Sequence, residues 1–400
     1  MSQNKIIAGI IVFFAALIFV LVMRPFFFST ASSAPAKLPA LQQQWQFQAD
    51  GQIKGALALD EDTLYAASDD GFLYALDLSG SPRWKTHIGP TYSAPAVGPD
   101  GAIYISNNNG RVLAVNRSGS IRWSTDVYAG DTWGQNGAAI GGSYLYAPSR
   151  GSLCALRLSD GHLDWDAEFL GGEQFAAVSL LPDGTILSPG RGRLNALDSR
   201  GEVLWQAPRL TPEQTRKNGG LPPPGTFYVS SGIAVAADRT LLAPTGQSGK
   251  LVAMSGDGTT KWEFPARNSA AAVVAADGTI YVTSSIGFFY AVDAYGTEKW
   301  ELMLTDTHTA PVLAADGTIF VHSLSYLYAL SPDGHIINRV EVGDNVNPEA
   351  SPTLAPDGTL FVATTHGKIV AYAGGHGGLM DSSWPKYQAD LVNSGVARVP

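Results

Sequence analysis

One pattern recurs about every 40 residues along this chain. It consists of a short strand, an acidic turn with glycine, a second strand, a third strand around Ala-Leu-Asp, and then Gly-x-x-x-Trp. A clear copy runs from Tyr290 through Asp293 and Gly296 to Trp300. The aligned tryptophans are spaced by 39, 39, 42, 40, 57 and 38 residues, at Trp45, Trp84, Trp123, Trp165, Trp205, Trp262 and Trp300. A fixed period of this length predicts one array of identical supersecondary units, and not several unrelated domains.

The turns within the repeats indicate how many units there are. Two apolar runs flank Asp316-Gly317, and an Asp-Gly pair between such runs is a strong hairpin signal, because glycine tolerates the positive φ of tight turns. The same turn position recurs eight times, at Asp62, Gly101, Gly142, Gly184, Arg239, Gly278, Gly317 and Gly358. Four short antiparallel strands per unit describe a propeller blade. We therefore predict an all-β, eight-bladed β-propeller, with seven blades as the alternative.

The repeated tryptophans are predicted to be structural. One tryptophan per blade buries a large area between neighbouring sheets, and its indole N–H needs a partner. The seventh unit lacks this residue, since Asn338 stands where tryptophan is expected. We expect that blade to contact its neighbour less tightly.

The N-terminus is predicted to lie in a membrane. Residues 6–22 form an uninterrupted apolar run that follows Lys5, long enough for a transmembrane helix. Lys5 places the N-terminus in the cytoplasm and the repeats on the other side. We assign residues 1–28 to an uncleaved anchor or, as the alternative, a signal sequence, and residues 29–40 to a tether. Residues 41–400 are the propeller.

The two ends of the repeat region have different predicted roles. Trp45 is in register with the later repeats, so residues 44–48 should supply the outer strand of the eighth blade. Residues 381–400 then form a C-terminal tail. Pro385 argues against a central strand there, so we expect the tail on the outside or the underside of the body.

Composition excludes several classes of function. The net charge is −9 and only 15% of residues are charged, which argues against nucleic acid as a partner. Cys154 is the only cysteine, and it reads as a small buried hydrophobe. The seven histidines show no metal-binding spacing, and no nucleophile elbow or phosphate loop occurs. We therefore assign no catalytic residue and no metal ligand.

The repeat resembles a known family. The motif Ala-x-Asp-x-x-Gly-x-x-x-Trp is similar to the tryptophan-docking motif of pyrroloquinoline-quinone (PQQ)-type propellers, and it covers residues 45–374. The segment from Trp384 to Gly395 resembles an end segment common in that family. The family includes quinoprotein dehydrogenases and non-catalytic propellers, among them the propeller lipoprotein of the outer-membrane barrel-assembly machine. The resemblance is specific for fold rather than activity.

The resemblance raises PQQ with calcium as an alternative cofactor. Quinoproteins of this fold often stack the quinone on a vicinal disulfide, which a single cysteine cannot form. No clustered set of acidic and amide residues matches their calcium ligands. We therefore expect no cofactor.

Candidate binding residues lie in loops of one face, where blades connect and where second and third strands join. The candidates for the partner face are Asp131, Trp133, Gln135, Asn136, Glu173, Gln174, Phe175, Arg191, Tyr228, Asn268, His308 and Glu349. The second loop set also contains Asp69, Asp70, Asn107, Lys250 and His366. Many of these side chains are expected to cap strands or to be solvated.

The expected function is that of a non-catalytic binding or scaffold protein. The propeller would stand on the periplasmic side of the inner membrane, held by residues 6–22, and would bind a protein of the cell envelope. If the N-terminal segment is cleaved, the protein would be secreted. The alternatives are a PQQ-dependent oxidoreductase and a module that recognises glycans or peptides.

Overall fold

Residues 39–400 form one compact unit. The computed structural model describes residues 41–127, 137–149, 152–168, 176–190, 192–208, 216, 229, 232–245, 248–267, 269–304, 309–323, 325–343, 350–373 and 375–398. Within these ranges no helix has the length and apolar character needed to cross a membrane. The predicted transmembrane helix of residues 6–22 and the tether of residues 29–40 lie outside them.

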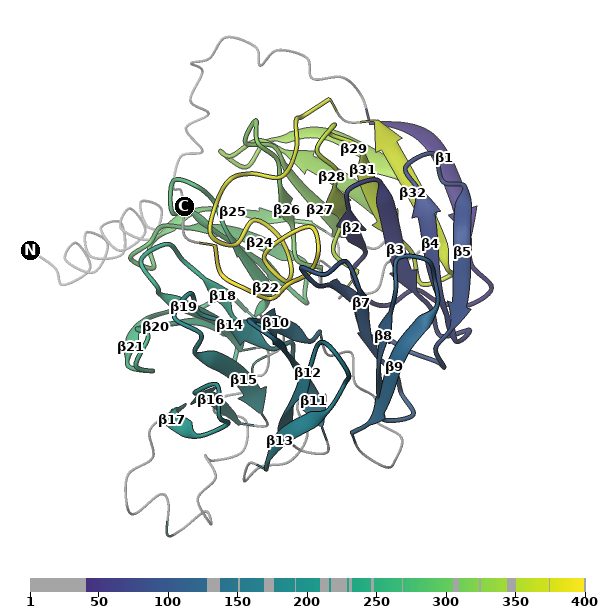
Figure 1. Ribbon diagram of the computed structural model, residues 1–400. Coiled ribbons are helices and arrows are strands. Elements are labelled where there is room, and N and C mark those ends of the chain that lie inside the picture. Colours follow the sequence, from purple (N-terminus) through teal and green to yellow (C-terminus); the bar gives the residue numbers. More distant parts are fainter. Residues whose placement is uncertain are drawn as a thin grey trace, which may run out of the picture. The chain divides into compact units, whose positions relative to one another are not determined.

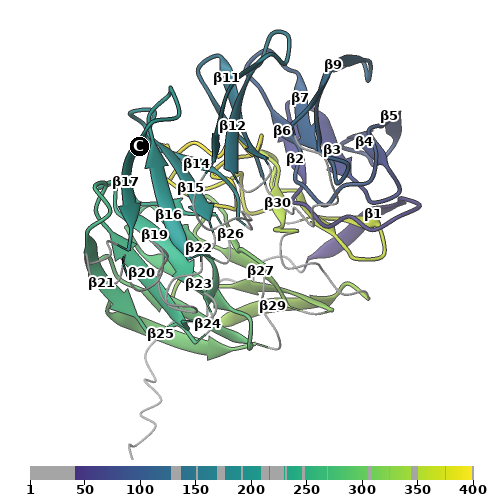
Figure 2. The ribbon, with the colours of Figure 1, turned by 90° about the horizontal axis from the view of Figure 1, so that it is seen from below.

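Eight antiparallel sheets of four strands each are arranged in a ring (Figures 1 and 2), which confirms the eight-bladed propeller and rules out the seven-bladed alternative. In blades 1 to 4 the chain runs from the innermost to the outer strand of each sheet. Blade 1 consists of β2 (Ala58–Asp60), β3 (Thr63–Ala67), β4 (Phe72–Asp77) and β5 (Pro82–His87). Blade 2 consists of β6 (Ala96–Val97), β7 (Ile103–Ser106), β8 (Arg111–Val115) and β9 (Ile121–Asp126). Blade 3 consists of β10 (Ala139–Gly141), β11 (Tyr144–Ser149), β12 (Ser152–Arg157) and β13 (Leu163–Glu168). Blade 4 consists of β14 (Ser179–Leu180), β15 (Ile186–Gly190), β16 (Arg193–Leu197) and β17 (Val203–Ala207).

Blades 5 to 7 repeat this order, and blade 8 departs from it. Blade 5 consists of β18 (Ala234–Val235), β19 (Leu241–Thr245), β20 (Lys250–Met254) and β21 (Thr260–Phe264). Blade 6 consists of β22 (Ser269–Val274), β23 (Ile280–Ser284), β24 (Phe288–Val292) and β25 (Glu298–Met303). Blade 7 consists of β26 (Val312–Leu313), β27 (Ile319–Ser323), β28 (Tyr326–Leu330) and β29 (Ile336–Glu341). Blade 8 consists of β30 (Thr353–Leu354), β31 (Leu360–Ala363), β32 (Lys368–Ala373) and, as its outer strand, β1 (Gln42–Gln48).

The N-terminal strand closes the ring as predicted. β1 pairs antiparallel with β32, and Trp45 lies opposite Ala371. This is the register that Trp84 has opposite Ala75 in blade 1. Because the first and last strands of the array share one sheet, no blade is left with an unpaired third strand.

The hairpin turns follow the sequence signal with two local departures. Six of the predicted turn positions are glycines with positive φ, such as Gly317 at 89°. Arg239 adopts the same left-handed region with φ of 65°. In blade 1 the left-handed residue is Glu61, at 52°, one residue before the predicted Asp62. The turn there is shorter, because Asp60 pairs directly with Thr63.

The predicted tryptophan girdle is present between the blades. Each tryptophan lies against a glycine in the turn before the outer strand of the following blade, so that a Cβ on that glycine would meet the indole. The contacting glycines, in chain order of the tryptophans, are Gly80, Gly119, Gly161, Gly201, Gly258, Gly296 and Gly334. Trp123 is buried and its indole nitrogen donates to the Leu158 carbonyl at 2.9 Å. The other six tryptophans are half-buried.

The missing eighth tryptophan has a structural reason. Asn338 occupies the register position opposite Ala329 that tryptophan occupies elsewhere. The next blade is blade 8, in which the chain leaves β32 instead of turning into an outer strand, since β1 fills that place. Among the described residues, no glycine of blade 8 therefore takes the place on which an indole lies in the other blades.

Candidate functional site

We call the end of the ring where first and second strands join the lower rim, and the opposite end the upper rim. All twelve predicted partner-face residues belong to loops of the upper rim, and all lie outside the described residues: Asp131, Trp133, Gln135, Asn136, Glu173, Gln174, Phe175, Arg191, Tyr228, Asn268, His308 and Glu349. They stay a prediction.

Described polar residues of the upper rim serve the turns in which they lie. The Asp70 carboxylate accepts hydrogen bonds from the Phe72 N–H at 2.9 Å and the Tyr74 hydroxyl at 2.6 Å. The buried side-chain oxygen of Asn107 accepts the N–H groups of Asn109 and Arg111, both at 3.0 Å. These contacts satisfy main-chain donors in tight turns, which is a structural role.

The inner part of the upper rim carries a cation against an aromatic ring. The Lys54 ammonium lies 3.5 Å from the centre of the Tyr92 ring. Lys54 belongs to the connection into blade 1 and Tyr92 to the connection into blade 2, so the contact joins two neighbouring blades. Such an arrangement is stabilised by the negative face of the ring.

The C-terminal segment (residues 375–398) lies over the axis at the lower rim, where Figure 1 shows it as the yellow chain crossing the centre of the ring. Its carbonyl groups accept hydrogen bonds of 2.7–3.0 Å from main-chain N–H groups of six inner strands. The donors are Leu59, Val97, Ile140, Leu180, Val274 and Leu313, and the acceptors are Leu391, Val392, Ser394, Gly395, Trp384 and Pro385 in that order. Of the two predicted locations, outside and underside, the underside is therefore correct.

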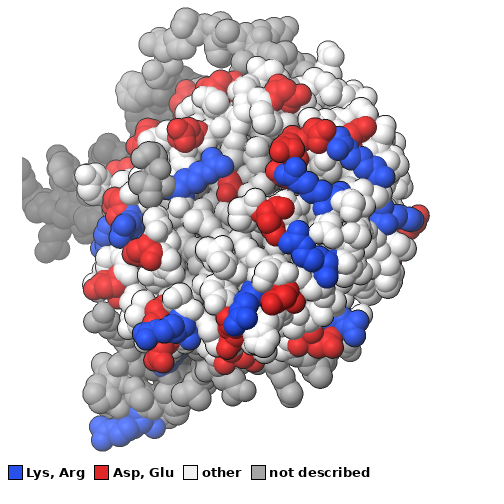
Figure 3. Space-filling view, in the orientation of Figure 1, with Lys and Arg blue, Asp and Glu red and all other residues white. Residues whose placement is uncertain are grey.

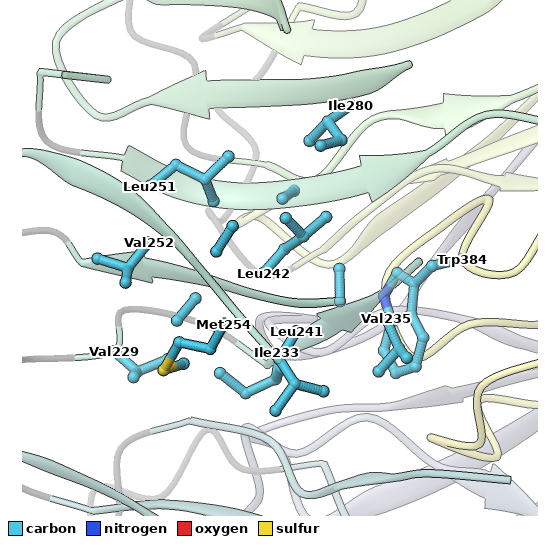
Figure 4. Packing of buried hydrophobic residues seen from close by; sticks show 14 of the residues in the cluster. Val229, Ile233, Val235, Leu241, Leu242, Leu251, Val252, Met254, Ile280 and Trp384 are labelled. Carbon is cyan, nitrogen blue, oxygen red and sulfur yellow. The ribbon is translucent and has the colours of Figure 1, made fainter. Parts of the chain in front are cut away.

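A fully buried lysine organises this segment. The Lys386 ammonium donates to the Asn393 side-chain oxygen at 2.7 Å and to the Asp390 carbonyl at 3.1 Å. The Asn393 amide in turn donates to the Pro95 carbonyl of blade 2 at 2.9 Å. Burial lowers the pKa of Lys386 to about 7, because the charged form loses its hydration. The segment also contributes apolar contacts, since Trp384 lies beside Val235 in the core of blade 5 (Figure 4).

The described residues do not assemble a recognisable catalytic centre. No group of three or more His, Cys, Asp or Glu side chains among them is placed to hold a metal ion. Burial raises the pKa of the Cys154 thiol to about 12, so it is not an activated nucleophile. Burial also lowers the pKa of His322 to about 3, and within the described structure neither of its ring nitrogens has a hydrogen-bond partner.

The outer strands differ in how their edges are protected. The residue before the tryptophan is charged in five of them, namely Arg83, Arg122, Asp164, Lys261 and Lys299. The four cations pair with the aspartate in the first turn of their own blade. Examples are Arg83 with Asp62 at 2.6 Å and Lys261 with Asp238 at 3.2 Å. In Figure 3, basic and acidic side chains are interspersed over the face in view, and no large basic patch is visible there.

The outer strand of blade 4 lacks this protection. β17 contains no charged residue, and Leu204 occupies the position before its tryptophan. Val203 and Leu204 have exposed fractions of 46% and 54%. The first-turn aspartate of this blade, Asp183, pairs with Arg239 of blade 5 at 3.3 Å instead. We name β17 with these two side chains the docking edge. Unpaired, uncharged apolar edges attract further strands.

The sequence matches the model of the family described as outer membrane protein assembly factor BamB, over residues 40–185 and 190–336. These ranges cover more than half of the chain. The chain belongs to this family.

Solved structures with the same fold have low sequence identity to this chain. BamB from Moraxella catarrhalis has a TM-score of 0.68 at 19% identity, covering 84% of this chain and 100% of that one. The C-terminal WD40 domain of Sif2 has a TM-score of 0.68 at 11% identity, with 84% and 99% covered. The computationally designed protein Ika8 has a TM-score of 0.66 at 12% identity, covering 82% of this chain and 97% of that one. These similarities concern the fold alone. No curated protein matches the sequence.

Two features escaped the sequence analysis. The docking edge carries a signal that an alignment of the residues preceding the tryptophans would have revealed, because leucine interrupts a row of charges at position 204. The contacts of the C-terminal segment carry no comparable signal. A lysine between Pro385 and Tyr387 looks solvent-exposed until its acceptors are known.

Proposed function

We propose that the protein is a non-catalytic scaffold of the cell envelope that binds a protein partner through the docking edge of blade 4. The partner contributes an extended segment that pairs with β17 as a fifth strand. Residues 6–22 anchor the propeller to the cytoplasmic membrane from the periplasmic side.

The observation that carries this proposal is the exposed apolar pair of Val203 and Leu204 on an uncharged outer strand. β17 ends its sheet, so no strand among the described residues lies beside one row of its main-chain groups. Strand addition uses such groups for affinity and the flanking side chains for selection. Leu163, at the start of the outer strand of blade 3, is a further exposed apolar residue on the same side of the ring.

Membership of the BamB family supports an envelope partner, since the family's description concerns assembly of outer membrane proteins. The alternative of a PQQ-dependent oxidoreductase needs oxygen ligands for calcium. The described ranges contain no cluster of acidic side chains that could provide them.

The test compares two matched substitutions in the full-length protein. Leu204→Lys gives blade 4 the cation that blades 1, 2, 5 and 6 carry, and Asp183 lies on the turn that such a cation contacts in those blades. Ile336→Lys makes the same kind of change at the exposed start of β29 in blade 7. Partners captured from solubilised membranes are quantified for the native protein and both variants.

An envelope protein that is captured by the native chain and by Ile336→Lys, and is lost from Leu204→Lys, is the expected result. Equal capture by all three proteins would show that partners do not use the docking edge.

A further inference from the structure

The chain fills several of its own interblade grooves with aromatic rings. In blade 1, Phe72 and Tyr74 of β4 face blade 8, where Phe47 lies 5.4 Å from the Tyr74 ring. The Lys85 ammonium lies 4.6 Å from the centre of the Phe72 ring. The groove is thus occupied by two rings and one cation, which is a stabilising combination.

The same arrangement recurs in blades 6 and 7. Tyr290 contacts Phe264 of blade 5 at 5.3 Å, and the Arg267 guanidinium lies 4.5 Å from the Phe288 ring. In blade 7 Tyr326 lies beside Tyr328, and a guanidinium, that of Arg339, again lies 4.7 Å from the Tyr326 ring.

Blade 2 has the same strand register as blade 1, but its third strand carries no aromatic rings at the corresponding positions. Arg111 stands opposite Asp126 where blade 1 pairs Phe72 with His87. Leu113 stands opposite Ser124 where blade 1 pairs Tyr74 with Lys85. A groove of about 900 Å³ lies between blades 1 and 2 at this place. Its lining includes Ile88, Gly89, Arg111, Leu113, Ile121 and Val127.

The groove has an apolar floor and a fixed cation. Ile88 and Leu113 are buried, and Ile121, a further lining residue, is exposed. The Arg111 Nε donates to Asp126 at 2.7 Å, which orients the guanidinium plane. Gly89 also lines the groove, and it occupies the position in the connection between blades where Arg267 lies over the Phe288 ring of blade 6.

We propose that this groove binds an aromatic side chain presented by an extended peptide segment of another protein. The ring takes the place that Phe72 and Tyr74 take in the neighbouring groove, over Leu113 and against the Arg111 guanidinium. A volume of about 900 Å³ also accommodates the residues that flank the ring. The groove is separate from the docking edge of blade 4, so the two proposals succeed or fail independently.

The test uses methyl resonances of the full-length protein in detergent micelles. The probe is the tripeptide N-acetyl-Gly-Phe-Gly-amide, and its control contains cyclohexylalanine in place of phenylalanine. An aromatic ring over the floor shifts the methyl signals of Leu113, Ile121 and Val127 upfield through its ring current. Two methyl-bearing residues outside the groove lining serve as controls, Ile53 in the cluster between blades 8 and 1 and Val370 in the cluster between blades 7 and 8, and their signals should not move.

The variant Arg111→Phe with Leu113→Tyr rebuilds the aromatic ladder and fills the groove. It should weaken binding of the phenylalanine peptide at least about tenfold, while Ile121 and Val127 report the loss. If this variant does not fold, Ile121→Asp tests the same entrance from an exposed position.

Upfield shifts with the phenylalanine peptide that vanish in the filled variant support the proposal. Absence of shifts in the native protein, or equal shifts with the cyclohexyl control, would overturn it.

Discussion

Each sheet of the ring has an inner edge at the axis and an outer edge, and the main-chain groups of the two edges are treated differently. On the axis, N–H groups of six described inner strands donate to the C-terminal segment. At the outer edge, no described strand pairs with the last strand of each sheet, and charged residues lie on most of these strands. The inner edges of these six strands are thus satisfied by the chain itself, whereas the outer edge of β17 is apolar and uncharged.

This difference suits the axis to a role in stability and the edge of β17 to a role in recognition. A change at the axis affects several blades at once, because one short segment contacts them all. A change on β17 affects a half-exposed strand and should leave the ring intact. The predictions below are ordered by their expected effect on stability and ask whether this separation holds.

The largest effect is expected from removing residues 381–400. The truncation exposes the inner strands and deletes the buried Trp384, Tyr387 and Lys386. Loss of one large buried side chain alone costs about 3–5 kcal/mol, so the truncated protein should unfold or aggregate. Urea unfolding followed by circular dichroism measures this. A truncated protein with a native-like midpoint would show that the segment only covers the ring.

The second-largest loss of stability is expected from Trp123→Ala. Trp123 is the buried member of the girdle, with a hydrogen bond to the Leu158 carbonyl. Its removal should cost about 3–5 kcal/mol of unfolding free energy. The converse change, Asn338→Trp, should not stabilise the protein, because the described part of blade 8 has no glycine turn into its outer strand on which the indole could lie. A stabilised Asn338→Trp would contradict that explanation.

Lys386 should give the axis a pH dependence. Its pKa is 10.5 in an unfolded chain and about 7 when buried. The unfolded state therefore binds more protons between these values, and the contribution of Lys386 to stability rises with pH from about 7 to 10.5. Relative to Lys386→Met, the unfolding free energy of the native protein should increase by about 1 kcal/mol per pH unit in this window. Urea titrations of both proteins at pH 7.5 and 9 measure the difference. A gap independent of pH would show that the lysine is not desolvated.

The smallest effect on stability is expected from Leu204→Lys. The leucine is about half exposed, and a lysine at this position has Asp183 within the same blade, as in blades 5 and 6. The unfolding free energy should change by less than about 0.5 kcal/mol. Thermal melts against the native protein test this, and a large loss would place Leu204 in the core rather than on an edge.

The sequence predicted the ring in detail because each blade carries its own local signals. Turn glycines and tryptophans recur at fixed spacing, and the register of Trp45 assigned the N-terminal strand to blade 8. The binding surfaces could not be predicted in this way. The predicted upper-rim residues lie outside the described ranges, and the buried state of Lys386 depends on contacts with Asn393 and Asp390 that form only after the ring has closed.

The most direct measurement is site-specific photo-crosslinking at the outer edge. A photoreactive amino acid is placed at position 204 of β17 or, as the control, at position 299 of β25, the same register in blade 6. Crosslinking in intact cells followed by mass spectrometry should yield one envelope protein at position 204 and none at position 299. A crosslinked partner at position 299, or equal yields at both positions, would contradict the proposal that the partner pairs with the unprotected edge of blade 4.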